Sequence, residues 1–280
     1  MTDRRPIGVF DSGIGGLTVL REIWNSVPGE STIYFGDNSR APYGTKSKST
    51  IIRYSLQNLK FLESRDVKMI VIACNTASAY AYEVLKKRAK VPVVEVVTPG
   101  ADVACRSTKN GKIGIIATKG TISTGVYKAA VEKRAEELGL KNIEIYQQAC
   151  PLFVSLAEEG WWDTEVTRLT AEEYLKPLKQ AGVDTLVMAC THYPLLSKVI
   201  GEVMGKDVVL VNTGEATAEV VKELLGKETE TSEGAGEGAI REFYTSDDPE
   251  LFEKVAAPFL GEGLPSGTKH FTTDRYEVTI

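Results

Sequence analysis

The chain has 280 residues, of which 42% are hydrophobic and 25% charged, so it has the composition of a soluble globular protein with room for one large or roughly two domains. Its formal net charge of −5 excludes nucleic acid as the main partner, because binding phosphates requires a basic face. No stretch approaches the roughly 20 apolar residues that cross a bilayer, and the N-terminus lacks a signal-peptide core, so we expect a cytoplasmic protein without a membrane partner.

Short runs of β-branched and apolar residues alternate with amphipathic helical patterns along the chain. Helices are expected at residues 49–64 and 125–139, the second with Gly139 as its C-cap, and the basic cluster at 86–90 closes another. Several strands are apolar throughout, which is typical of a parallel sheet covered by helices on both faces, and the fold class is α/β. The expected strands are residues 6–10, 32–36, 68–73, 91–97, 112–117, 143–147, 185–189, 208–212 and 241–246.

A strand, a Gly-containing turn and a helix follow one another twice, at residues 7–20 and 113–127. This repeat predicts two pseudo-symmetric lobes, each a mainly parallel sheet flanked by helices. We expect the chain to leave the first lobe near residues 98–100, where Pro and Gly interrupt the pattern, and to return near 211–216. The resulting assignment is residues 1–97 plus 212–280 for the first lobe and 98–211 for the second.

Two buried strands each end in a cysteine. "VKMIVIACNTASAY" (67–80) and "VDTLVMACTHYPLL" (183–196) align without gaps, so that Cys74 matches Cys190, and hydrogen-bonding residues follow both. Ligands of open parallel sheets bind beyond the carboxyl ends of the strands. Two lobes facing each other would therefore place the thiols on opposite walls of one cleft.

Few kinds of chemistry use two such thiols. A disulfide exchanger usually holds them in Cys-x-x-Cys, a Cys/His nucleophile needs only one, and one His with scattered cysteines does not make a four-ligand zinc set. Reversible proton transfer across a stereocentre does require two opposed bases, and the thiol pKa of about 8.5 makes both forms accessible. Asp11 and His192 are the candidates to hold or accept the proton of each thiol.

The turn "DSGIGG" (11–16) matches neither glycine template for nucleotide phosphates. Its three glycines, Gly13, Gly15 and Gly16, would instead bring backbone N–H groups close to a small anion at a helix N-terminus, with a purely structural turn as the alternative. Asp11 favours a functional turn, because a carboxylate at the end of a buried strand is costly without partners.

Other candidate features carry weaker signals. The polar loop 34–44 follows a strand, as loops that line sites often do, although similar loops are usually only turns. Cys105 and Cys150 lack the polar context of the paired cysteines and are interpreted as structural, and His270 has no motif around it. Residues 226–240 are expected to form a flexible acidic loop without catalytic content.

Five motifs together resemble one known family. "GVFDSGIGGLTVL", "YFGDNSRAPYG", "ACNTASA", "CPLFVSLAEEG" and "ACTHYPLL" are similar to the motifs of glutamate racemases, in the same order over residues 7 to 196, and "FYTSDDPELF" at 243–252 extends the likeness. The resemblance implies a two-base 1,1-proton transfer that interconverts L- and D-glutamate without a cofactor or metal. It also implies a homodimer and a role in supplying D-glutamate for peptidoglycan.

The resemblance also assigns roles to the candidate residues. It implies that Cys74 and Cys190 are the two acid/base thiols, with Cys74 acting on D-glutamate and Cys190 on L-glutamate. Asp11 stands where the family's carboxylate assists the first thiol, and His192 where its imidazole assists the second.

The acidic position of the "LAEEG" motif corresponds to Glu158, with Glu159 as the alternative. Ser155 stands where many relatives have proline, which changes little because it precedes the acidic pair. The positions matched to substrate binding are Ser12, Tyr43, Gly44, Asn75, Thr76, Thr118, Thr121, Thr191 and His192.

Three other functions remain to be distinguished from this one. An aspartate racemase, or a related thiol isomerase of the same superfamily, would share the motifs and differ only in substrate length. A two-lobed binding protein would have no use for matched thiols. A redox protein would space its cysteines closely, whereas these two lie 116 positions apart.

Overall fold

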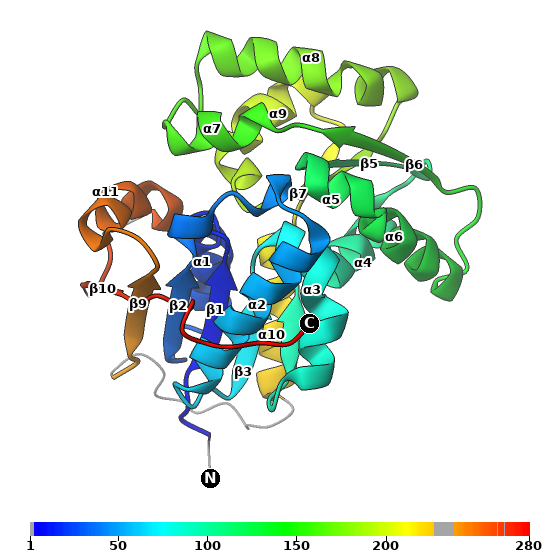
Figure 1. Ribbon diagram of the computed structural model, residues 1–280. Helices are drawn as coiled ribbons and strands as arrows, with labels where there is room; N and C mark the ends of the chain where they lie inside the picture. Colours follow the sequence, from blue (N-terminus) through cyan, green and yellow to red (C-terminus); the bar gives the residue numbers. More distant parts are fainter. Residues whose placement is uncertain (1–2, 227–237, 262, 266) are drawn as a thin grey trace.

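The computed structural model describes residues 3–226, 238–261, 263–265 and 267–280 and consists of two parallel β-sheets with helices on both faces (Figure 1). Most of the expected acidic loop, residues 227–237, lies outside the described residues. The six-stranded sheet has the order β10-β9-β2-β1-β3-β4, and the four-stranded sheet the order β6-β5-β7-β8.

All strand pairings are parallel, so each sheet has its carboxyl ends along one edge. The strands of the first sheet are β1 (Ile7–Asp11), β2 (Thr32–Gly36), β3 (Met69–Ile72), β4 (Val93–Glu95), β9 (Arg241–Thr245) and β10 (Thr268–His270). Those of the second are β5 (Lys112–Ala117), β6 (Glu144–Ala149), β7 (Thr185–Ala189) and β8 (Val209–Asn212).

Each sheet separates two hydrophobic clusters, one on each face. On the first sheet, one cluster includes α1 (Leu17–Ser26), α10 (Thr213–Gly226) and α11 (Pro249–Leu260), and the other α2 (Lys48–Glu63) and α3 (Asn75–Arg88). On the second sheet, one includes α7 (Leu152–Glu158), α8 (Glu165–Ala181) and α9 (Ser197–Met204), and the other α4 (Val97–Ser107) and α6 (Val126–Glu137). Short helices are α5 (Lys119–Thr124), η1 (Asn38–Arg40), η2 (Tyr43–Thr45) and η3 (Tyr193–Leu196).

Local sequence explains where the expected helices begin and end. The hydroxyl of Ser47 accepts a hydrogen bond from the N–H of Thr50 at the start of α2, whose apolar face is buried as expected. Helix α6 is followed by Gly139 at a φ of 68°, the left-handed conformation that favours glycine after a helix. The basic cluster does close a helix, since Lys86, Lys87 and Arg88 form the last turn of α3.

Two expectations about the elements are wrong. Residues 98–100 do not interrupt the pattern, because they lie in the first turn of α4, where proline is tolerated since the first N–H groups of a helix have no partner within it. Strand β10 was not expected, because the three residues "TKH" carry no apolar alternation. It is recognisable only as the parallel neighbour of β9.

The second sheet is drawn wholly from residues 112–212, between β4 and β9 of the first sheet. The chain returns directly from β8 into α10, which packs against both α1 and α4. Among the described residues, no helix combines the length and apolarity that crossing a bilayer requires.

Candidate active site

The carboxyl ends of the two sheets meet through side chains. In the first sheet β3 lies beside β1, and Cys74 follows β3 closely; in the second, β7 lies beside β5, and Cys190 follows β7 directly. The hydroxyl of Thr76 lies 3.1 Å from the hydroxyls of both Thr118 and Thr121, which follow β5. These contacts join Thr76, which follows β3 of the first sheet, to two residues of the second sheet in one threonine cluster.

Cys74 occupies the N-cap position of α3. Its Sγ accepts a hydrogen bond from the N–H of Ala77 at 3.4 Å and lies 3.5 Å from Oγ of Ser12. Burial, together with the nearby carboxylate of Asp11, raises the pKa of the Cys74 thiol to about 12. The thiol is therefore protonated at neutral pH, and a base is needed to activate it.

Asp11 is completely buried at the end of β1. Its Oδ2 accepts the N–H of Gly13 at 2.9 Å, whereas Oδ1 has no hydrogen-bond partner among the described residues. Burial raises the pKa of Asp11, and the charge of His192 and backbone N–H groups of the turn oppose this effect.

The glycine turn curls around this carboxylate. A Cβ at Gly16 would lie 2.4 Å from Cβ of Asp11, so only glycine allows the approach. The N–H of Gly13 thus donates to the chain's own carboxylate, an anion that the sequence analysis did not consider for these donors.

Cys190, His192 and Glu158 form a linear series of side-chain contacts. Its Sγ lies 3.8 Å from Nδ1 of His192, whose Nε2 lies 2.9 Å from Oε1 of Glu158. Burial disfavours the imidazolium, but the hydrogen bonds to Cys190 and Glu158 outweigh it and raise the pKa of His192 to about 10. Of the two acidic candidates, both exposed, Glu158 is therefore the one beside the imidazole, while Glu159 is the C-cap residue of α7.

The glycine turn of the first sheet also touches this group. The hydroxyl of Thr18 donates to the carbonyl of Thr191 at 2.8 Å. A Cβ at Gly15 would lie 2.3 Å from Oγ1 of Thr191 and 2.5 Å from Cε1 of His192. The ring of Phe259 in α11 packs edge-to-face against His192, with centroids 5.6 Å apart.

Asn75 has a partner that sequence reasoning missed. The hydroxyl of Tyr127, in α6, hydrogen-bonds to Oδ1 of Asn75 and is itself bonded to the side chain of Thr213. Nδ2 of Asn75 is buried and has no hydrogen-bond partner among the described residues. No local motif signals Tyr127, because it lies 52 positions from Asn75, in a helix that packs on the second sheet.

Tyr43 and Gly44 lie in η2, beside the second sheet. The side chain of Tyr43 is buried and its hydroxyl donates to Asp37. A Cβ at Gly44 would lie 3.0 Å from Cβ of Thr118, which places η2 against the threonine cluster.

The other two cysteines and His270 make none of these contacts. Sγ of Cys105 lies 3.5 Å from the carbonyl of Val131 in the core, and His270 is exposed on β10. Cys150 is buried after β6, and its carbonyl accepts a hydrogen bond from Tyr193 at 2.9 Å. Within the described residues, no group of His, Cys, Asp and Glu side chains has the arrangement of a metal site.

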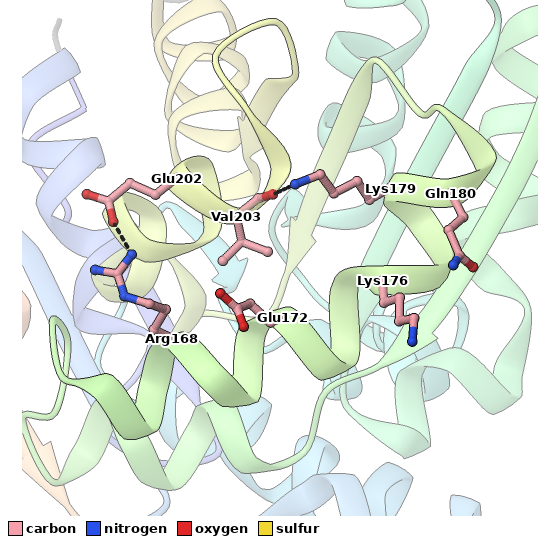
Figure 2. A pocket seen from close by; sticks show the side chains of 7 residues that line it. All are labelled: Arg168, Glu172, Lys176, Lys179, Gln180, Glu202 and Val203. Atoms are coloured by element: carbon pink, nitrogen blue, oxygen red, sulfur yellow. Dashed lines mark hydrogen bonds and ion pairs between the residues drawn. The ribbon is translucent and has the colours of Figure 1, made fainter.

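A surface groove between α8 and α9 has a different character (Figure 2). Arg168 lies 3.3 Å from Glu202 across it, and Nζ of Lys179 donates to the carbonyl of Val203 at 2.9 Å. None of the sequence-predicted site residues lines this groove. The chemistry is therefore expected at the strand ends.

Comparison with known proteins gives a consistent result. A model of the Asp/Glu/hydantoin racemase family matches residues 7–221. Glutamate racemase of Geobacter metallireducens is 50% identical over 260 residues, which are 93% of this chain and 94% of that protein. The crystal structure of glutamate racemase from Francisella tularensis in complex with D-glutamate superposes with a TM-score of 0.88 at 37% identity and covers 98% of this chain and 100% of that one. Aspartate racemase of Picrophilus torridus, at 20% identity, a TM-score of 0.54 and coverage of 79% of this chain and 94% of that one, shares the fold alone.

Proposed function

This chain belongs to the Asp/Glu/hydantoin racemase family, and from that premise we propose that it interconverts L- and D-glutamate by proton transfer between Cα and two cysteine thiols. The observation that carries the proposal is the matched position of Cys74 and Cys190. Cys74 follows β3, the neighbour of β1 in the first sheet, and Cys190 follows β7, the neighbour of β5 in the second. A hydrogen bond between Thr76 and Thr118 links the carboxyl ends of the two sheets. Glutamate is favoured over aspartate because the relatives of high identity are glutamate racemases, whereas the aspartate racemase is distant.

In the direction from D to L, the thiolate of Cys74 removes the proton from Cα. The C–H bond breaks, its electron pair stays on Cα, and an S–H bond forms on Cys74. The thiol of Cys190 then gives its proton to the opposite face of Cα, and running the steps backwards exchanges the two roles. Asp11 accepts the proton that Cys74 must lose beforehand. His192 holds the proton of Cys190 as an imidazolium while Cys190 is a thiolate, in agreement with the raised pKa of His192.

The buried atoms without partners support an amino-acid ligand. Oδ1 of Asp11 is an acceptor suited to an α-ammonium, and Nδ2 of Asn75 is a donor suited to a carboxylate. The hydroxyls of Thr76, Thr118 and Thr121 add three donors beside them. Ser12 and Thr191 extend this set, and the main chain of Tyr43 and Gly44 binds the second carboxylate.

Proton abstraction without a cofactor needs strong support for the developing negative charge. Fixed donors in a water-poor site provide it, because they need no reorganisation as the charge develops. The burial of Asp11, Cys74, Cys190 and His192, each less than 9% exposed, supports such a site. The proposal requires no cofactor and no metal.

We extend the proposal to the setting of the reaction. The chain supplies D-glutamate for peptidoglycan in the cytoplasm and acts as a homodimer. Of the two lobes, residues 1–97 plus 212–280 carry Asp11 and Cys74, and residues 98–211 carry Cys190 and His192. Closure of one lobe on the other excludes water.

The test is to incubate the pure protein with each glutamate enantiomer in D₂O without added cofactor, and to follow the reaction by chiral analysis and mass spectrometry. Racemisation with deuterium at Cα is expected. Cys74→Ser and Cys190→Ser should each abolish it, whereas the control Cys105→Ser should retain it. Turnover of aspartate alone, or only with added pyridoxal phosphate, would refute the proposal.

A further inference from the structure

We propose that Arg40 is a positioning residue for the segment 37–45, and that the C-terminal segment, residues 271–280, clamps that segment by completing the set of acceptors around Arg40. The inference rests on the proposed function, because 37–45 contains Tyr43 and Gly44, whose main chain binds a substrate carboxylate. Neither Arg40 nor the C-terminal segment carries the chemistry.

The guanidinium of Arg40 has an acceptor for each of its five N–H donors, which is the full capacity of the group. Its side chain is 10% exposed and lies with Cζ 4.1 Å from the ring centroid of Tyr54. The acceptors are both carboxylate oxygens of Asp37 (2.9 Å from Nε), Oε1 of Gln57 and Oδ1 of Asp274 (2.6 and 3.0 Å from Nη1), and Oδ1 of Asn58 and Oγ1 of Thr273 (3.1 and 2.5 Å from Nη2).

Two of the residues that bind Arg40, Asp37 and Asn58, also bind Tyr43. The hydroxyl of Tyr43 donates to Oδ2 of Asp37 and accepts from Nδ2 of Asn58 at 3.2 Å. The ring of Tyr43 is thus fixed by groups that Arg40 fixes in turn. Since Gly44 is the next residue and abuts Thr118, the position of this main chain depends on the network.

The C-terminal segment runs across α2 and is tied to it at several points (Figure 1). Thr273 is buried, with an exposed fraction of 1%, and the rings of Phe271 and Phe61 pack with their centroids 4.3 Å apart. Further along, Nε2 of Gln57 donates to the carbonyl of Tyr276 at 3.0 Å. These contacts fix the segment so that two of its side chains reach Arg40.

The cost of losing those acceptors explains why the clamp matters. Asp37 is fully buried, and a buried ion pair is stable only when its remaining donors and acceptors are satisfied. Without Thr273 and Asp274, two N–H groups of Arg40 lose their partners, and the network around Tyr43 loosens. The thiols lie on other elements, so substrate affinity should suffer while the chemical step is preserved.

The test uses the double variant Thr273→Val, Asp274→Asn, which removes the hydroxyl acceptor of Thr273 and the negative charge of the acceptor at Asp274 with little change of shape. The matched control is Glu277→Gln, which also converts an acid to an amide at an exposed position of the same segment. In the double variant we expect KM for glutamate to rise about tenfold, as for the loss of hydrogen bonds to a charged group, with kcat nearly unchanged. Thr273→Ser, which keeps the hydroxyl, should restore much of the affinity when combined with Asp274→Asn.

Amide hydrogen exchange gives a readout that does not depend on turnover. Exchange of residues 37–45 should be faster in the double variant than in the wild type and the control. An unchanged KM in the double variant would overturn the inference, even if its folded fraction falls. Unchanged exchange of residues 37–45 would overturn it as well. If the wild type does not racemise glutamate but residues 37–45 still exchange faster in the double variant, the proposed function is refuted and the positioning role of Arg40 is retained.

Discussion

Gly15 lies in the turn between β1 and α1, where a methyl group would collide with residues of the other sheet. An added Cβ would lie 2.3 Å from Oγ1 of Thr191, 2.5 Å from Cε1 of His192 and 2.6 Å from Nδ1 of the same ring. Ordinary contacts begin at 3.4 Å, so Gly15→Ala must push Thr191 or the turn away by about 1 Å.

This displacement acts on the group that supports Cys190. His192 lies between Sγ of Cys190 at 3.8 Å and Oε1 of Glu158 at 2.9 Å, and both distances would change. A misplacement of about 1 Å costs about 10²-fold in rate, so we expect kcat to fall by about two orders of magnitude. Overpacking should also destabilise the fold by about 1–3 kcal/mol.

The assay is the initial rate of racemisation in each direction, together with urea unfolding to correct for the folded fraction. The control is Gly201→Ala in α9, where an added Cβ would meet only Cδ1 of Leu210, at 3.6 Å. That variant should keep both activity and stability. If Gly15→Ala retains wild-type kcat per folded molecule, the contact between the turn and the His192 group has no catalytic importance and the reasoning fails.

Three further predictions concern charge and packing. Because the pKa of His192 is raised from 6.5 to about 10, its protonation stabilises the fold fully below pH 6.5 and progressively less as the pH rises to about 10. Glu158→Gln should weaken this pH dependence of the unfolding free energy, and an unchanged slope would contradict the prediction. The carboxylate of Asp11 helps to raise the pKa of Cys74 to about 12, so Asp11→Asn should lower that pKa and speed alkylation of Cys74 at a fixed pH. Peptide mass spectrometry measures the alkylation rate, and a slower reaction would argue against the electrostatic coupling. Phe61→Ala empties a fully buried site between aromatic rings and should cost about 3–5 kcal/mol in urea unfolding, and a loss below about 1 kcal/mol would show that the site collapses.

Sequence alone predicted the fold well because its signals are local. Apolar runs bounded by turns predicted nine strands, and the structure has a strand at each of those places. The missing strand, β10, has three residues and exists only because β9 lies beside it. The proline in the first turn of α4 was expected to interrupt the pattern and does not, because the same residue that breaks a helix interior is tolerated at its start.

The candidate site was predictable where residues follow strands or share a motif. Asp11 ends a buried strand, Cys74 and Cys190 follow two others, and parallel pairing brings these residues to the edges of the sheets. Tyr127 and Arg40 were not singled out as functional candidates. Their roles depend on partners from distant parts of the chain, such as Thr273, which is 233 positions from Arg40.

The position of the second sheet within the chain has a consequence for biosynthesis. Strand β9 pairs with the outer edge of β2, yet the ribosome makes it only after all of β5 to β8. Until then β2 presents unpaired backbone groups, which are a template for association with other chains. The acceptors that Thr273 and Asp274 offer to Arg40 emerge later still. A nascent chain therefore acquires both cysteines long before Thr273 and Asp274 can bind Arg40, so the segment 37–45 gains its last contacts late in synthesis.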